Sequence, residues 1–244
     1  MAFQTVFKRY ELKYLLTLAQ KEKILEVMAP YMQLDQYGRT AIRNIYFDTD
    51  DYRLIRRSIE KPVYKEKLRI RSYSQATHES TVFVELKKKY DDVVYKRRLA
   101  LNEKAAMAWI CGEKPCPVDT QISREIDYFM RFYGNLNPAV FLTYEREAYF
   151  ERTGGDFRVT FDDQILCRQA EIDLCKGIYG TPILPEGMIL MELKCPGAIP
   201  LWMVRALSRE RIYKTSFSKY GTAYGSLIFP EIHMQREMDE LCVM

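Results

Sequence analysis

The sequence predicts an α+β protein built on an eight-stranded antiparallel β-barrel, a tunnel with helices packed outside it. About eight segments show the two-residue alternation of strands, and several are joined by turns instead of helical crossovers. At least six of these segments carry Lys, Arg or Glu on one face and mainly apolar residues on the other. The helical segments need apolar surface to pack against, and the outer strand faces supply it.

The composition permits a sizeable core and limits the classes of partner. With 244 residues and 48% hydrophobic residues, the chain fits one large domain. The net charge of +4 is too small for general adhesion to nucleic acid, so the placement of the 37 Lys and Arg residues matters more. We expect no sequence-specific nucleic-acid partner.

Cysteine and histidine usage excludes several enzyme classes. The six cysteines form no Cys-x-x-Cys pair and no zinc-type spacing with histidine, and no secretory segment precedes them, so we expect a cytoplasmic protein. No apolar run approaches the roughly 18 to 20 residues that span a bilayer, so action at a membrane would need an associated partner, which the sequence does not identify. Two histidines, His78 and His233, argue against a Ser-His hydrolase, a His-ligated zinc enzyme and a histidine general base.

The first third of the chain predicts two strands and two helices. Strands are expected over 7–16 and 43–49. A helix follows the first strand, because Thr17 and Gln20 form a capping box and Pro30 ends the apolar stripe. A short helix over 51–59 is expected after the capping residues Asp48, Thr49 and Asp50.

The segment 63–73 is the most unusual strand, because every second residue from position 65 is basic. Side chains two apart on a strand share a face and stand roughly 7 Å apart. At that distance neighbouring cations repel by about 2 kcal/mol per pair at an effective dielectric near 20. Such a face requires full solvation, opposed carboxylates or a long anionic ligand; the cations are Lys65, Lys67, Arg69 and Arg71.

The next two strands repeat the pattern. The strand over 81–90 places Phe83, Glu85, Lys87 and Lys89 on one face, and a turn at 91–92 leads to a strand over 93–101 with Lys96 and Arg98. Three consecutive strands therefore carry cations on one face and largely apolar residues on the other.

The remainder alternates helices and strands. The expected helices are 102–110, 119–133, 200–212 and 216–227, the last with Lys219. Strands are expected over 139–150 with Arg146, 157–162 with Arg158, and 188–194 with Glu192 and Lys194. The segment 163–187 is expected to be irregular or edge structure.

Six charged strand faces together favour a charged lumen over six separately solvated surfaces. A cationic tunnel suits a chain of phosphates better than a duplex, which needs an open basic surface. Carboxylates among the cations are candidates for Mg²⁺ or Mn²⁺. We favour metal binding for Glu192 and neutralisation of adjacent lysines for Glu85, and we leave Glu11 undecided.

A set of segments in fixed order resembles the VTC domain, the polyphosphate polymerase branch of the triphosphate tunnel metalloenzymes. The resemblance covers about 3–228 of a single domain and leaves 229–244 as a C-terminal tail. It implies an eight-stranded tunnel that binds ATP with a divalent metal and moves the terminal phosphoryl group onto a growing polyphosphate chain. The segments are F-K-R-Y-E-L-K-Y, I-Y-F-D-T, K-L-R-I-R-S-Y, V-F-V-E-L-K-K-K, Y-K-R-R, Y-E-R-E-A-Y, F-R-V-T-F-D, I-L-M-E-L-K and S-F-S-K-Y.

The resemblance also assigns residues. Glu192 matches the metal-binding glutamate, with Glu11 and Glu85 as further candidates. Four basic residues are predicted to be catalytic: Arg69, Arg71, Lys87 and Arg146. The predicted phosphate-binding residues are Lys13, Lys67, Lys96, Arg98, Arg158, Lys194 and Lys219.

Two departures from the family pattern bear on the activity. Hydrolytic members begin with Glu-x-Glu-x-Lys, whereas Arg9 replaces the first acid here, which weakens a metal-rich hydrolase. The eukaryotic polymerase subunits also carry a phosphate-sensing domain and membrane helices that this sequence lacks, so it gives no indication of coupling to translocation.

Phosphoryl transfer to phosphate suits the residues better than hydrolysis does. A phosphate acceptor is already anionic and needs no general base, whereas water needs one or an orienting group. Polyphosphate synthesis is therefore the first hypothesis, a tripolyphosphatase or nucleoside triphosphatase the second, and a non-catalytic polyphosphate-binding module the third. Arg69→Ala or Arg71→Ala is expected to abolish turnover with little loss of stability.

Overall fold

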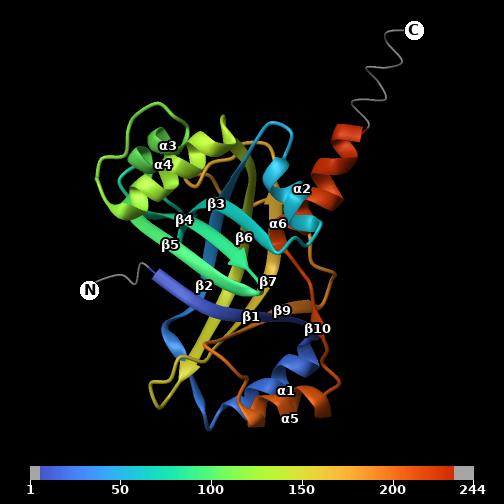
Figure 1. Ribbon diagram of the computed structural model, residues 1–244. Coiled ribbons are helices and arrows are strands. Elements are labelled where there is room, and N and C mark those ends of the chain that lie inside the picture. Colours follow the sequence, from blue (N-terminus) through green and yellow to red (C-terminus); the bar gives the residue numbers. More distant parts are fainter. Residues whose placement is uncertain (1–5, 234–244) are drawn as a thin grey trace.

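Eight long strands form the body of the molecule in the computed structural model, which describes residues 6–233, with side chains from residue 10 onward (Figure 1). The two-residue strands β8 (Thr181–Pro182) and β10 (Lys214–Thr215) pair with β7 and β1. The long strands are β1 (Val6–Thr17), β2 (Met32–Asp48), β3 (Tyr64–Ser72), β4 (Thr81–Tyr90), β5 (Val93–Asn102), β6 (Asn137–Glu151), β7 (Arg158–Arg168) and β9 (Met188–Cys195).

The long strands close into a ring in which every pairing is antiparallel. Strand β1 pairs with β5, the order continues through β4, β3, β2, β6 and β7, and β9 joins β7 back to β1. The predicted fold class, an antiparallel tunnel with helices outside, is confirmed. Closure removes the exposed sheet edges and separates an inner face from an outer one.

The turn between β4 and β5 fixes the register of the two most basic hairpin strands. Asp91 and Asp92 have φ values of 43° and 65°, the left-handed conformation of a two-residue hairpin turn. The predicted turn at 91–92 is confirmed, and it places Lys87 beside Lys96 and Glu85 beside Arg98.

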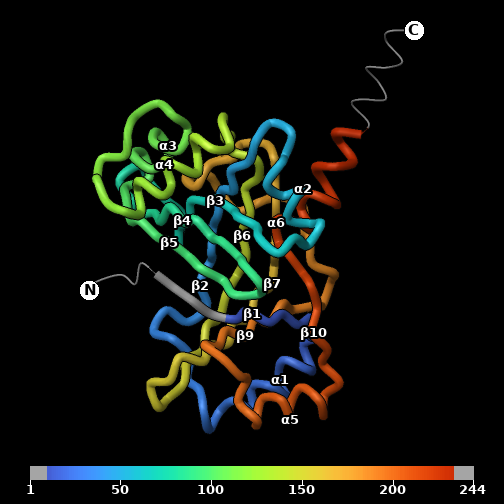
Figure 2. The backbone as a smooth tube through the Cα atoms, in the orientation of Figure 1, coloured from blue at the N-terminus to red at the C-terminus, as the bar shows by residue number. Residues whose placement is uncertain are grey.

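Within residues 6–233, six α-helices cover the ring (Figures 1 and 2). Helices α3 and α4 lie over the β4–β5 side, and α1 and α5 lie side by side at the other end. Helix α6 continues into a π-helical turn, η1 (Tyr224–Ile228). The helices are α1 (Leu18–Met28), α2 (Arg53–Ile59), α3 (Glu103–Ile110), α4 (Gln121–Tyr133), α5 (Leu201–Arg209) and α6 (Lys219–Ala223).

Apolar packing lies mostly between the outer strand faces and the helices. Leu68 and Ile70 of β3 pack in one cluster with Trp109 of α3 and Phe129 of α4. A second cluster joins α1 and α5 to β1, β7 and β9, and a third surrounds α6 and η1 against β2 and β6. Each large apolar side chain buried this way contributes about 1.5–3 kcal/mol. Most of the folding stability therefore comes from outside the ring, whose interior holds charged residues together with some aromatic and aliphatic ones.

Local capping explains where two of the helices begin. The hydroxyl of Thr17 accepts from the Gln20 N–H at 3.2 Å, and the Gln20 side chain accepts from the Thr17 N–H at 3.0 Å, which confirms the predicted capping box. The Asn102 side chain accepts from the Ala105 N–H at 2.8 Å and starts α3 where the sequence predicts it.

Several predicted boundaries were wrong. Strand β2 begins at Met32 instead of 43, and β7 continues through 163–168 because Ile165 and Cys167 are buried. Helix α5 ends at Arg209, and the predicted helix over 216–227 begins at Lys219 and becomes a π-helix.

The start of α2 also differs from the prediction, because Tyr52 in left-handed conformation is its N-cap. The carboxylate of Asp48 nevertheless accepts from the N–H groups of Leu54 and Ile55 at 2.8 and 3.0 Å. Of the predicted tail, 234–244 lies outside the described residues. Within residues 6–233, no helix has the length and apolar character to cross a bilayer.

Candidate functional site

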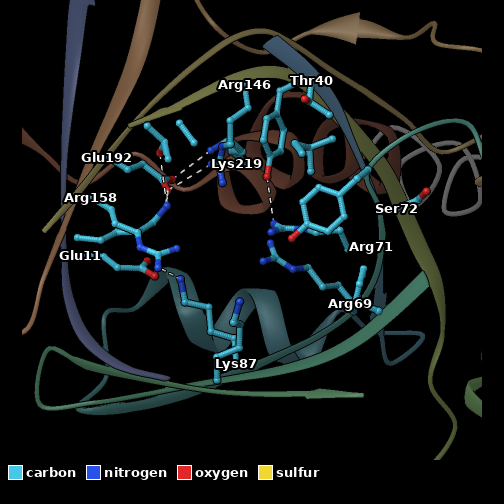
Figure 3. A pocket seen from close by; sticks show the side chains of 18 of the residues that line it. Glu11, Thr40, Arg69, Arg71, Ser72, Lys87, Arg146, Arg158, Glu192 and Lys219 are labelled. Atoms are coloured by element: carbon cyan, nitrogen blue, oxygen red, sulfur yellow. Dashed lines mark hydrogen bonds and ion pairs between the residues drawn. The ribbon is translucent and has the colours of Figure 1, made fainter. Parts of the chain in front are cut away.

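The ring encloses a cavity of about 710 Å³ whose lining is strongly basic (Figure 3). Eleven Lys and Arg residues line it against three Asp and Glu residues, and none of the lining residues is histidine. All the basic residues that the sequence predicts as catalytic or phosphate-binding are brought together here: Lys13, Lys67, Arg69, Arg71, Lys87, Lys96, Arg98, Arg146, Arg158, Lys194 and Lys219.

Strand alternation and ring closure together explain this lining. In β3, Lys67, Arg69 and Arg71 face the cavity, while Leu68 and Ile70 face the helices. Lys65 has the same parity but is not among the lining residues, and its ammonium donates to the Ser58 carbonyl at 3.2 Å.

Helix α6 completes the lining from outside the sheet. Ser218, Lys219 and Tyr220 line the cavity, and the Ser218 hydroxyl accepts from the Gly221 N–H at 3.2 Å. The Tyr220 ring stacks on Tyr46 of β2 with centroids 4.9 Å apart. This packing holds the Lys219 ammonium inside the ring.

One side of the cavity is organised by Glu85, which has no exposed surface. Its Oε2 accepts from Arg69 Nε at 2.8 Å, and its Oε1 accepts from Arg98 Nε at 2.8 Å. Lys96 Nζ lies 3.4 Å from Oε1, and Arg71 Nε lies 3.9 Å from Oε2. We name Glu85, Arg69, Arg71, Lys96 and Arg98 the Glu85 cluster.

Glu85 therefore neutralises cations of β3 and β5 and not the lysines that follow it on β4. This corrects the expected partners, although neutralisation itself was the favoured interpretation. Arginines bind both carboxylate oxygens at hydrogen-bonding distance, which leaves no free oxygen for a metal. We do not retain Glu85 as a candidate metal ligand.

The other side of the cavity is organised by two carboxylates. Glu192 lies 3.1–3.5 Å from four cationic nitrogens, and Asp162 holds Arg146 through two hydrogen bonds of 2.5 and 2.6 Å. Lys219 bridges the two acids, at 2.5 Å from Asp162 and 3.1 Å from Glu192. We name this group the Glu192 cluster; it consists of Lys13, Arg146, Asp162, Glu192, Lys194 and Lys219.

Glu11 and Arg158 adjoin the Glu192 cluster, because each is the cross-strand neighbour of Lys194. Lys87 Nζ donates to Glu11 Oε2 at 2.6 Å, so the undecided Glu11 has a firm basic partner (Figure 3). Arg158 is exposed while still lining the cavity. The side chain of Arg9, which replaces the first acid of the hydrolase signature, lies outside the described residues.

Several residues of the site were not identified from the sequence. Asp162 follows Arg158 by four residues on one strand, and this even spacing could have revealed it. The hydroxyls of Tyr46 and Tyr144 accept from Arg69 and Arg71 at 2.8 and 3.1 Å, and no sequence signal distinguishes these tyrosines from core residues. They orient the two arginines toward the cavity.

Burial and like charges alter the protonation of the lining. Burial, together with Arg98, Arg71 and Arg69, lowers the pKa of Lys96 to about 6 even though Glu85 opposes the shift. Burial and neighbouring cations lower the pKa of Lys67 well below its ordinary value. Burial favours the neutral form of Glu192, but Lys219 and Lys194 outweigh it and hold its pKa well below the usual range.

The carboxylates fit a divalent metal only together with a phosphate ligand. Glu192 lines the cavity and is ionised, and its shortest ion pair, 3.1 Å to Lys219, is longer than the 2.7 Å pair between Glu85 and Arg69. Mg²⁺ and Mn²⁺ accept one or two carboxylates completed by phosphate oxygens and water. Four cations around Glu192 oppose a bare dication, whereas a polyphosphate would offset them. Glu192, with Glu11 as a further candidate, is the donor set that fits.

Comparison with known proteins agrees with this fold. The VTC domain profile matches residues 8–228. A candidate adenylate cyclase from Bacillus halodurans has a similar structure, with a TM-score of 0.56, 14% identity, and coverage of 88% of this chain and 96% of that one. A candidate adenylyl cyclase from Hippeastrum, reported with a dominant triphosphatase activity, has a TM-score of 0.51 and 14% identity over 89% and 95%. Comparison with curated protein sequences gives no significant match.

Proposed function

Since this chain belongs to the VTC domain family, we propose that it is a polyphosphate polymerase. In this proposal it transfers the terminal phosphoryl group of ATP to the end of a polyphosphate chain held in the cavity. The coarser function, phosphoryl chemistry on a triphosphate inside a tunnel, is common to polyphosphate synthesis and to triphosphate hydrolysis. The single domain over 1–244 remains a prediction, and so does the cytoplasmic location. The five cysteines that the structure describes are free thiols, which is compatible with a reducing compartment.

One observation carries the proposal: eleven Lys and Arg residues line a cavity enclosed by a closed ring of strands. A linear polyphosphate has a negative charge on every unit and no bulky side groups, so it matches a narrow cationic interior. A nucleic-acid duplex requires an open surface instead. The cavity supports a threaded phosphate chain as the ligand.

The residues take separate roles in this proposal. Arg69, Arg71, Lys87 and Arg146 would contact the transferred phosphoryl group and neutralise its charge, as basic clamps do in phosphoryl transfer. Glu192 would hold a divalent metal, which when bound neutralises phosphate charge. The other cations would bind the chain along its length: Lys13, Lys67, Lys96, Arg98, Arg158, Lys194 and Lys219.

The proposed reaction needs no proton transfer. An oxygen of the terminal phosphate of the chain forms a bond to the γ-phosphorus of ATP. The bond between that phosphorus and the β–γ bridging oxygen breaks, and ADP leaves with the oxygen and its electron pair. Water as acceptor would have to lose a proton, and basic partners lower the pKa values of Glu11 and Glu192, so these two carboxylates are weak bases. Transfer to phosphate needs no base, and for this reason we propose it ahead of hydrolysis.

Hydrolysis of triphosphates is the second candidate function. It is favoured by the structural likeness to the Hippeastrum protein, which is reported with a dominant triphosphatase activity. The same basic residues would bind the substrate in either reaction. The two functions differ only in the acceptor, so the product identifies the reaction.

The test is incubation of the purified chain with ATP and Mn²⁺ or Mg²⁺. We expect long polyphosphate on a gel and ADP in equal amount to the phosphoryl groups transferred. Orthophosphate release without polymer would replace synthesis by hydrolysis, and tripolyphosphate binding without turnover would indicate a binding module.

Lys67→Ala and Lys65→Ala form a matched pair on one strand. Both residues have the same parity in β3, but only Lys67 lines the cavity. We expect the first substitution to reduce synthesis and the second to leave it unchanged. Equal loss in both variants would contradict the assignment of the cavity as the site.

A further inference from the structure

A second group of chemically reactive side chains lies outside the cavity lining. His78 lies in the β3–β4 connection, Glu103 is the first residue of α3, and Cys175 lies in the loop after β7. One donor atom from each residue lies within 4.8 Å of the other two, and His78 Nδ1 is 2.9 Å from Glu103 Oε2. None of the three lines the cavity.

Backbone and side-chain hydrogen bonds already hold the three segments together. The N–H groups of Glu103 and Lys104 donate to the carbonyls of Ser80 and His78 at 2.9 and 3.1 Å. The Gln75 side chain donates to the Cys175 carbonyl at 2.7 Å, and the Ala76 N–H donates to the preceding Leu174 carbonyl at 3.2 Å. The three side chains are therefore positioned in advance of any ligand.

Glu103 is a buried carboxylate without a permanently charged partner nearby. Its side chain is 5% exposed, and its ion pair within residues 10–233 is with His78 alone. The buried acids of the cavity differ, because Glu85 and Asp162 each contact arginine. A buried carboxylate needs a compensating charge, and a bound cation would supply it.

Ligand access to this position is open. The His78 side chain is 72% exposed, so an ion can reach the imidazole from solvent. Cys175 is free and partly exposed.

We propose that His78, Glu103 and Cys175 form a transition-metal site of the Zn²⁺ class. Imidazole, carboxylate and thiolate are zinc ligands, and three protein ligands with water complete a tetrahedron. Bonds of about 2.0–2.3 Å place tetrahedral donors roughly 3.3–3.8 Å apart, which is close to the present separations of 2.9 Å for His78 and Glu103 and at most 4.8 Å for the other pairs. A thiolate and an imidazole also select against Mg²⁺ and Mn²⁺, which separates this site from the tunnel metal.

A metal here would join the helix α3 start to two loops. Ser74 and Thr81, which flank the His78 loop, both line the cavity. Bound zinc would therefore stabilise the wall of the tunnel at that end. This inference concerns the chain's own ligands and does not depend on the proposed polymerase activity.

The test is titration of the reduced protein with Zn²⁺ by calorimetry and with Co²⁺ by absorption spectroscopy. We expect one bound ion per chain, release of the thiol proton to buffer, and a thiolate-to-Co²⁺ charge-transfer band. Cys175→Ser should abolish the band. His78→Ala should weaken Zn²⁺ binding about 100-fold, at the upper end of the 10- to 100-fold loss seen for groups that support metal ligands.

Control variants come from the same residue types elsewhere. Cys111→Ser and His233→Ala remove an exposed thiol and the other histidine, and both should bind as the parent does. Glu192→Gln should also retain the site. Thermal melts without metal confirm that the variants fold, and Zn²⁺ should raise the Tm of the parent and the controls only.

Three results would overturn the site. They are absence of binding by folded parent protein, a charge-transfer band that persists in Cys175→Ser, and equal loss of affinity in the control variants. Any of these results would mean that His78 and Glu103 form only a hydrogen-bonded pair beside the Cys175 thiol and bind no metal.

Discussion

The two clusters on opposite sides of the cavity solve the same electrostatic problem in different ways. In the Glu85 cluster one fully buried acid forms ion pairs with four basic residues, and this acid is not among the residues that line the cavity. In the Glu192 cluster two acids form ion pairs with four basic residues, and one of these acids, Glu192, lines the cavity. One side therefore presents cations alone, and the other presents cations with an accessible carboxylate.

This difference separates binding from metal-assisted chemistry. An acid beneath the surface reduces the repulsion among cations and leaves their outward donors for phosphate. An acid at the surface offers oxygen to a metal when phosphate supplies the remaining ligands. We infer that the basic residues of the Glu85 cluster bind phosphate groups directly. The Glu192 cluster would bind the phosphate groups that also coordinate the metal.

The largest expected effect on turnover comes from removing an arginine of the Glu85 cluster that binds phosphate. Arg69→Ala or Arg71→Ala should lower turnover by about 10³-fold or more, the range for an arginine that neutralises transferring phosphate. Stability should fall much less than turnover, because Glu85 retains three other basic partners and the loss of one cation relieves repulsion among them. Steady-state kinetics and urea unfolding measure the two quantities.

Arg97→Ala is the matched control for those arginine variants. Arg97 adjoins Arg98 on β5 but pairs with Glu125 at 3.0 Å and does not line the cavity. Its removal should leave turnover unchanged. An unfolded Arg69 variant would mean that the Glu85 cluster is structural, and a defective Arg97 variant would mean that the loss of turnover is not specific to the cavity lining.

The second effect sharpens the contrast between the two acids. Glu85→Gln leaves four cations around a neutral buried group and should destabilise the fold by about 3–5 kcal/mol. Glu192→Gln should cost less than that, because Asp162 still pairs with Arg146 and Lys219. Urea unfolding of both variants measures this difference. Similar losses of stability would remove the distinction between the clusters.

A smaller effect is expected from a lysine with no acidic partner. Within the described side chains, Lys67 forms no ion pair; its ammonium donates to the Ser218 hydroxyl at 3.1 Å. Lys67→Met should weaken tripolyphosphate binding about tenfold, or 1.4 kcal/mol. Its free energy of unfolding should be unchanged or higher, because a half-buried cation without an acidic partner is removed. Calorimetric binding and urea unfolding test both parts, and a clear loss of stability would contradict them.

The smallest effect is a pH dependence of binding. Lys96 faces Glu85 on β4, Arg98 on β5, and Arg69 and Arg71 on β3, and its pKa is about 6. Above that pH the Lys96 amine is neutral. A bound polyanion would raise the pKa of this amine, so binding would be accompanied by uptake of a proton. Affinity for tripolyphosphate should therefore fall as pH rises from 6 to 8, by at most tenfold per unit for each proton taken up.

Calorimetry in two buffers of different ionisation enthalpy measures this proton uptake. Lys96→Met should reduce it, while Lys65→Met should not. Affinity that is constant or increases with pH would contradict the expected direction.

The sequence by itself determined the strands, their charged faces and the cations of the lumen. Side-chain alternation is a local property with a period of two, so Arg69 and Arg71 share a face with Lys67 in any sheet that contains this strand. Capping at Thr17 and Asn102 is equally local and was predicted correctly. The extent of β2 and β7 was not, because pairing with neighbouring strands lengthened both.

Only the tertiary structure decided which acid forms an ion pair with which basic residue. Glu85 meets Arg98 through hairpin register, and Asp162 meets Lys219 across 57 residues of sequence because the ring closes. His78, Glu103 and Cys175 show no metal-binding spacing, yet the fold brings them together. Such contacts depend on register and closure, which are set by the whole core, so no local pattern encodes them.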